Sequence, residues 1–120
     1  MIFDTNVLIY LSKFALDPAK ILKEKAAISV ITKIEALGYP FPNVQEHELL
    51  KAICNELEVI PLTDHISEET IKLRTNYRIK LPDAIIYATA LVQQVPLLTR
   101  NIADFKMFGN KVEIIDPFTL

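Results

Sequence analysis

The sequence is poor in cysteine and glycine, and it has no tryptophan and no long apolar run. No segment of its 120 residues approaches the ~20 apolar residues that a membrane-spanning helix needs. Cys54 is the single cysteine and has no partner for an internal disulfide, which favours a reducing compartment. No basic segment precedes the first apolar run, so we expect no signal peptide. These absences indicate a cytoplasmic protein without a membrane segment.

Histidine and net positive charge are also scarce. His47 and His65 lie apart from each other and from Cys54, so the ligand spacing of a zinc site is missing. The formal net charge is −2, which provides no general surface for nucleic acid. What the chain does have is an apolar content of 51% without low-complexity segments. This composition indicates a single globular domain over residues 1–120.

One local stretch is strongly basic. Between Glu69 and Asp83 the chain has no acid, and its cations are Lys72, Arg74, Arg78 and Lys80. The phosphate backbone of a nucleic acid could bind such a patch, and the alternative is an ordinary solvated helix face.

Short apolar segments alternate with helical patterns along the whole chain. This alternation, without two-residue hairpin turns, predicts βαβ units and therefore a parallel sheet with helices on both faces. We expect strands at residues 2–5, 27–30, 58–62, 96–99 and 111–115. We expect helices at 7–11, 18–25, 32–37 with Thr32 as the cap, 43–57, 66–77 and from 82 onward, and a loop or short helix at 101–107.

The segment from Lys80 to Leu91 is expected to form a buried helix. Pro82 suits the first turn, and the residues after it are apolar on most helical faces. One carboxylate, Asp83, lies at the start of this helix, where a lone aspartate would ordinarily act as a cap.

Four acids occupy comparable positions in this pattern. Asp4 ends the first strand, Glu35 lies one helical turn after the second, and Asp104 follows the fourth by a short loop. Asp83 begins the helix that leads to the fourth strand. Sites of parallel sheets lie beyond the carboxyl ends of the strands, so the four carboxylates share one pocket if the first and fourth strands are neighbours. Each acid alone has an ordinary explanation, but an unpaired aspartate is costly to bury in an apolar strand.

Crowded carboxylates need compensation. Two charges ~4 Å apart repel by about 4 kcal/mol at an effective dielectric of about 20, so either some acids are protonated or a cation is present. Oxygen ligands without Cys or His select hard ions, which predicts Mg²⁺ or Mn²⁺. Asn6 and Thr99 stand beside the acids and could orient a water or a carboxylate, or simply cap the strand–helix junctions.

Four motifs together resemble those of PIN-domain nucleases, and within these the VapC-type toxin ribonucleases. They are Asp4-Thr5-Asn6; Ser29-Val30-Ile31-Thr32 before Glu35; Leu81-Pro82-Asp83-Ala84; and Thr99-Arg100-Asn101 before Asp104. The resemblance covers nearly the whole chain, and the ordered set is specific although each motif alone is weak. It implies a three-layer α/β/α fold with sheet order 3-2-1-4-5 and a centre that binds one or two divalent ions. The implied ligands are Asp4, Glu35, Asp83 and Asp104, with Asn6, Thr99 and Asn101 as supporting residues.

The expected function is therefore metal-dependent endoribonuclease activity that leaves a 5′-phosphate and a 3′-hydroxyl. Mg²⁺ held mainly by Asp4, Asp83 and Asp104 would activate a water, which Glu35 would hold or deprotonate. The candidate contacts for RNA phosphates are Arg74, Arg78, Lys80 and Arg100.

The resemblance further implies a toxin role, a small antitoxin partner and a homodimer. Ile9, Leu11 and Phe14 could serve such an interface, but we expect them in the core.

Two other functions compete with this one. A haloacid-dehalogenase-like phosphatase needs a second aspartate where Asn6 stands, and a receiver domain needs a phosphoacceptor that Pro61-Leu62-Thr63 does not provide. The other alternative is a non-catalytic RNA-binding or interaction module with the same fold. The full acidic set argues against it, because an idle site has no physical reason to keep crowded charges.

Overall fold

Short parallel strands form the centre of the fold in this computed structural model, which describes residues 1–22 and 25–120. The strands are β1 (Ile2–Phe3), β2 (Ala27–Ser29), β3 (Glu58–Ile60), β4 (Leu97–Leu98) and β5 (Ile114–Ile115). They form one sheet in the order β3-β2-β1-β4-β5, and every neighbouring pair is parallel. The predicted fold class and strand order are confirmed.

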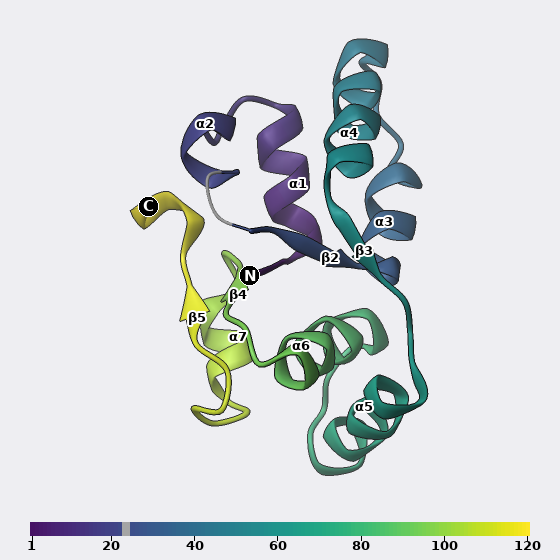
Figure 1. Ribbon diagram of the computed structural model, residues 1–120, viewed down its shortest axis with the longest axis vertical. Helices are drawn as coiled ribbons and strands as arrows, with labels where there is room; N and C mark the ends of the chain where they lie inside the picture. The colour runs from purple at the N-terminus through teal and green to yellow at the C-terminus, as the bar shows by residue number, and fades with distance from the viewer. Residues whose placement is uncertain (23–24) are drawn as a thin grey trace.

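Helices connect the successive strands and cover both faces of the sheet. They are α1 (Thr5–Ser12), α2 (Pro18–Ile21), α3 (Val30–Leu37), α4 (Val44–Glu56), α5 (Asp64–Asn76), α6 (Leu81–Gln93), α7 (Ile102–Lys106) and a 3-10 helix, η1 (Pro117–Thr119). Figure 1 shows α1 to α4 on one side of the strands and α5, α6 and α7 on the other. Among the described residues, no helix has both the length and the apolar character needed to span a bilayer.

The strands send alternate side chains into two cores. Ile2 and Leu97 are buried in the core that contains α6, whereas Phe3 and Leu98 are buried in the core that contains α1. Successive residues of a strand point to opposite faces, so a sheet covered on both faces needs apolar residues at every position. This is why the strands are short apolar runs in the sequence.

The predicted buried helix is α6, in which residues 84–90 are all buried. Pro82 lies in its first turn, and Gln94 ends the helix in the left-handed conformation with φ 57°. Lys80 occupies the N-cap position without a side-chain hydrogen bond. Asp83 therefore lies inside the first turn and is not the helix cap.

The start of α3 differs from the prediction. The Ser29 hydroxyl accepts a hydrogen bond from the Ile31 N–H at 3.2 Å and caps a helix that begins at Val30. Thr32, the expected cap, is buried inside α3. The expectation failed because two hydroxyl residues lie near the same junction, and the strand ends at the first of them.

Other differences concern the ends of elements and one apolar side chain. The predicted helix over residues 18–25 ends at Ile21, and residues 23–24 lie outside the described part of the chain. Leu11 is fully buried and Ile9 is partly buried, as expected. Phe14 was expected in the core but is 74% exposed, because a left-handed turn (φ 57°) follows α1 there.

Candidate active site

Asp4 is held at the carboxyl end of β1 by two hydrogen bonds. Its side chain is buried (4% exposed), and Oδ1 accepts from the Thr5 N–H while Oδ2 accepts from the Thr99 hydroxyl, both at 2.7 Å. Burial raises the pKa of Asp4, the two donors lower it, and the charge of Glu35 raises it. Thr99 directly follows β4, so the parallel pairing of β1 with β4 brings these two side chains together.

Glu35 is held near the same edge of the sheet by α1. The Thr5 hydroxyl donates to Glu35 Oε1 at 2.7 Å and lies 3.3 Å from the Thr32 hydroxyl. Thr32 and Glu35 are three residues apart on α3 and therefore share one helix face. The dipeptide Asp4-Thr5 thus links β4 on one side with α3 on the other.

Asp83 is half-buried in the first turn of α6. Burial raises its pKa to about 6, together with the charges of Asp4, Glu35 and Asp104, while Lys80 acts in the opposite direction. All three other acids act on this one carboxyl. The structure therefore brings the four predicted acids into one electrostatic neighbourhood.

Asp104 is exposed in the first turn of α7. It lines a hollow of about 250 Å³ together with Asp83 and Asn101, and we call this the acidic hollow. The other residues that line it are Arg78, Ile79, Lys80, Phe105, Met107 and Phe108. Asp4 and Glu35 lie outside this lining, toward β1 and α3.

The three predicted supporting residues, Thr99, Asn101 and Asn6, differ from one another in their hydrogen bonds. Thr99 donates its hydroxyl proton to Asp4 and accepts the Asn101 N–H at 2.9 Å, so it supports the acid and the loop before α7. Asn101 occupies the N-cap of α7 without a side-chain cap bond. Asn6 Oδ1 is buried without a hydrogen-bond partner among the described residues. A buried acceptor without a donor is unfavourable, so this oxygen is suited to a bound water or cation.

The donor set fits a hard divalent cation in its chemistry, because it consists of carboxylate and amide oxygens. In the described part of the chain, no three Asp, Glu, His or Cys side chains lie close enough together to hold an ion. A shared ion therefore requires the carboxylates to turn toward one another from these positions. Burial is the main cause of the raised pKa of Asp83, and like-charge repulsion, which a cation would relieve, adds to it.

Three of the four predicted phosphate contacts lie beside the acidic hollow. Arg74, Arg78 and Lys80 line a second hollow of about 460 Å³ with Tyr77 and Ile79, which we call the basic hollow. Arg78, Ile79 and Lys80 line both hollows, so the two adjoin.

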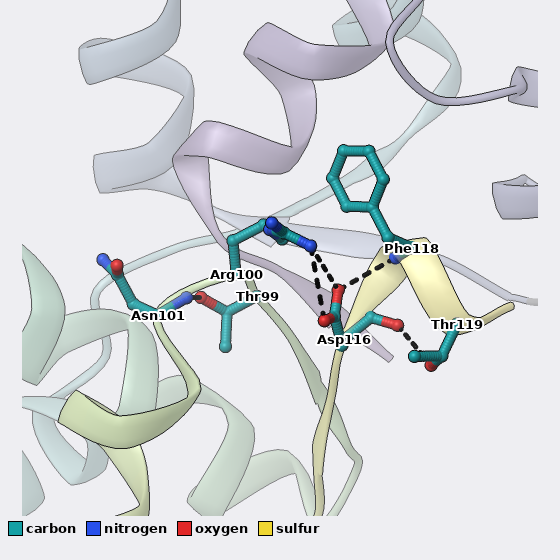
Figure 2. Close-up of polar contacts among 6 residues, drawn as sticks. All are labelled: Thr99, Arg100, Asn101, Asp116, Phe118 and Thr119. Atoms are coloured by element: carbon teal, nitrogen blue, oxygen red, sulfur yellow. Dashed lines mark hydrogen bonds and ion pairs between the residues drawn. The ribbon is translucent and has the colours of Figure 1, made fainter.

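Arg100, the fourth predicted contact, has a partner within the protein. Its Nη1 lies 3.4 Å from Asp116 Oδ2, and its guanidinium carbon lies 4.3 Å from the centre of the Phe118 ring. Figure 2 shows the Arg100 side chain directed toward η1 and the Asn101 side chain directed away from it. A contact between Arg100 and phosphate stays a prediction from the sequence, and it requires Arg100 to leave Asp116.

Sequence reasoning assigned no role to two residues that the structure places at the site. Thr5 stands between Asp4 and Asn6 in the first motif, and its hydroxyl positions Glu35. Tyr77 is the aromatic residue within the basic stretch and lines the basic hollow. The signal in the sequence was an aromatic residue within a stretch of cations that contains no acid.

Comparison with known families and proteins identifies one family. The model of the PIN domain family matches residues 1–109. The comparison with curated proteins found no match.

Similar solved structures cover almost the whole chain. A toxin-antitoxin complex from Klebsiella pneumoniae contains a chain with 33% sequence identity and a TM-score of 0.75, over 97% of this chain and 96% of that one. VapBC2 from Rickettsia felis, bound to a DNA fragment from its promoter, matches with 22% identity and a TM-score of 0.77, over 95% and 97% of the two chains. DNA-bound VapBC from Salmonella typhimurium matches with 18% identity and a TM-score of 0.81, over 97% and 96%. The last two similarities concern the fold alone.

Proposed function

This chain belongs to the PIN-domain family, and we propose that it is a metal-dependent endoribonuclease with Asp4, Glu35, Asp83 and Asp104 at its active centre. The observation that carries the proposal is the placement of these acids: Thr5 joins Asp4 and Glu35 at the end of β1, and Asp83 and Asp104 line one hollow. Burial and the charges of the three other acids also raise the pKa of Asp83 to about 6. A strongly perturbed carboxyl in a hollow is a candidate for catalysis.

Asp4, Asp83 and Asp104 would hold the divalent cation, with Glu35 beside them. When bound, Mg²⁺ or Mn²⁺ supplies a Lewis acid for a phosphodiester oxygen and lowers the pKa of a coordinated water. The oxygen-only donor set supports this choice of ion.

Glu35 is the residue that we assign to the attacking water. Thr5 fixes its Oε1 through the hydrogen bond of 2.7 Å, so its other oxygen can accept the proton of the water. Asp4 is assigned to the cation instead, because one hydrogen bond to each oxygen fixes its orientation and leaves a lone pair on each for a metal. Attack on phosphorus with loss of the 3′-oxygen leaves a 5′-phosphate and a 3′-hydroxyl.

Substitution of the acids tests this proposal. Asp83→Asn and Asp4→Asn each remove one charge that would bind the cation, which is worth several kcal/mol of transition-state stabilisation. We expect each purified variant to lose roughly a hundredfold or more of its rate of single-stranded RNA cleavage. The 5′ ends of the cleaved RNA, mapped by sequencing, also give the cleavage sites.

Glu68→Gln is the control, because Glu68 is an exposed acid of α5 that lines neither hollow. It should cleave RNA at the parental rate. A folded Asp83→Asn variant that cleaves equally fast would refute the mechanism. Mn²⁺ should raise the melting temperature of the parent and raise that of Asp4→Asn much less, because binding to the folded state stabilises it.

We further propose that the protein is the toxin of a toxin–antitoxin pair and acts in the cytoplasm as a homodimer with a small antitoxin as its partner. The support is the 33% identity to a chain of a toxin-antitoxin complex. Copurification with the product of a neighbouring small open reading frame, and loss of RNA cleavage in that complex, test this role.

Among the alternatives, the phosphatase and the receiver domain are inconsistent with the family assignment. A non-catalytic module of the PIN family is separated from the nuclease by the Mn²⁺ titration. If Mn²⁺ leaves the melting temperature unchanged, the non-catalytic function is favoured.

A further inference from the structure

We propose that the basic hollow is a subsite for single-stranded RNA, in which Arg74, Arg78 and Lys80 bind phosphates and Tyr77 stacks against a base. The inference rests on the proposed function and deepens it, because it assigns the path of the substrate next to the acidic hollow.

The three cations of this subsite form no ion pair within the described part of the chain, although Lys80 is near enough to Asp83 to lower the pKa of that carboxyl. Among the described residues, no carboxylate lies within ion-pair distance of Arg74, Arg78 or Lys80. Lys72, two residues before Arg74 on the same helix, is in contrast paired with Glu69 at 3.3 Å. Neighbouring unpaired cations repel one another, and the negative charges of a phosphate backbone compensate them.

Tyr77 gives the hollow an aromatic surface that is already held in place. It ends α5, is 38% exposed, and packs against Phe108 with ring centroids 4.9 Å apart and an interplanar angle of 76°. Phe108 in turn packs against the buried Tyr87 at 5.0 Å. Tyr77 is thus the exposed end of an aromatic cluster rooted in the core. Stacking on a preorganised ring requires little additional ordering of the protein.

The position of the hollow favours a nucleic acid strand over an isolated anion. Its wall of Arg78, Ile79 and Lys80 is shared with the acidic hollow. A strand bound along this wall passes from the cations to Asp83 and Asp104. The strand must be single, because only unpaired bases can stack on a side chain.

The test measures binding of a fluorescein-labelled single-stranded RNA of mixed sequence, about 12 nucleotides long, by fluorescence anisotropy in EDTA. The chelator removes divalent ions, so binding is measured without cleavage. Tyr77→Ala should weaken binding roughly 5- to 100-fold, whereas Tyr77→Phe, which keeps the ring, should stay within about twofold. Arg78→Gln should weaken binding roughly tenfold and reduce the slope of log K against log salt by about 0.7.

Lys51→Gln is the matched control. Lys51 is an exposed lysine of α4 that is paired with Glu48 at 3.5 Å, and its loss should leave the affinity within about twofold. Thermal unfolding of every variant shows whether it is folded, and Arg78→Gln tests the subsite without disturbing the aromatic cluster.

The outcomes separate the subsite from the proposed function. Unchanged affinity in both Tyr77→Ala and Arg78→Gln, with cleavage of RNA by the parent in Mn²⁺, refutes the subsite and leaves the nuclease standing. The expected losses of affinity with no cleavage by the parent support the subsite and refute the nuclease. Binding of a polyglutamate peptide that is tighter than that of RNA and is lost in Arg78→Gln assigns the hollow to an acidic peptide and overturns the RNA subsite.

Discussion

Asp4 and Asp83 belong to one site, but the protein holds their carboxylates in opposite ways. Asp4 is buried between β1 and β4, and both of its oxygens accept protein hydrogen bonds. Asp83 is half-buried at the start of α6, where its carboxylate has no such donor among the described residues and Lys80 is the cation that lowers its pKa. Burial raises the pKa of both groups, but hydrogen bonds oppose the rise at Asp4 and like charges add to it at Asp83.

This comparison separates two tasks within the acidic site. Hydrogen bonds to an ionised carboxylate offset part of its desolvation, so the charge and orientation of Asp4 depend less on a ligand. Asp83 has no equivalent compensation, so its ionised form is less favourable than that of a solvated aspartate and gains more from an approaching cation. In such a site Asp4 is held in place before the metal binds, and Asp83 is the carboxylate whose ionised form the metal would stabilise most.

The largest expected effect follows from removing the donor that compensates Asp4. Thr99→Val keeps the shape of the side chain but removes the hydroxyl that donates to Asp4 and accepts from Asn101. A buried carboxylate that loses a donor destabilises the fold by about 1–3 kcal/mol. Urea unfolding in EDTA at neutral pH should show this decrease in the free energy of unfolding.

Thr89→Val is the matched control for this prediction. The Thr89 hydroxyl is also buried, but it donates to the Ile85 carbonyl at 2.6 Å, and that carbonyl keeps its helical hydrogen bond without it. Its loss should cost clearly less than the loss of the Thr99 hydroxyl. Equal losses in the two variants would mean that Asp4 does not depend on Thr99.

The second prediction concerns Asp83, whose charge no protein hydrogen bond compensates among the described residues. The folded state holds a proton on Asp83 up to a pKa of about 6, compared with 3.8 for the unperturbed group, so parental stability falls as the pH rises through this interval. Asp83→Asn has no charge to bury. Its melting temperature in EDTA should equal that of the parent near pH 4 and exceed it by a few degrees above about pH 7, although we expect the variant to cleave RNA far more slowly.

An aspartate in the first turn of another helix supplies the control. Asp64 begins α5 and is exposed, so its charge interacts favourably with the helix dipole. Asp64→Asn should slightly lower the melting temperature at neutral pH, which is the opposite sign. If Asp83→Asn also lowers the melting temperature above pH 7, the comparison between Asp4 and Asp83 is wrong.

The positions of the acids in the fold could be predicted because parallel strands place their carboxyl ends along one edge. Asp4 follows β1 and Thr99 follows β4, so the strand order alone brings these two residues together. Pro82 and the apolar residues that follow it placed Asp83 at the start of a buried helix. What sequence reasoning could not show is the difference in compensation, because that depends on hydrogen bonds between residues as far apart as Asp4 and Thr99.

The contacts of Thr5 and Arg100 show where sequence reasoning stops. The Thr5 hydroxyl donates to Glu35 on α3, a helix that begins directly after β2 and earlier than expected. Arg100 is directed to Asp116, which lies after the last strand and outside the four motifs. Local patterns identify charged residues but do not show which of them the fold pairs internally.

The smallest expected effect tests whether the Arg100 side chain stays bound to Asp116 and Phe118 or binds the RNA. An exposed ion pair and a contact with an aromatic ring are each worth at most about 1 kcal/mol, so Arg100→Gln should lower the melting temperature only slightly. Because the guanidinium is engaged by Asp116 and Phe118, the KM for RNA should stay within about twofold of the parental value.

Asp116→Asn is the informative counterpart, since it releases the Arg100 guanidinium while the amide oxygen can still accept the Phe118 N–H. A KM that rises about tenfold in Arg100→Gln and falls in Asp116→Asn would show that Arg100 leaves Asp116 to bind phosphate. The segment after β4 would then have two tasks, because Thr99 positions Asp4 and Arg100 would bind the substrate.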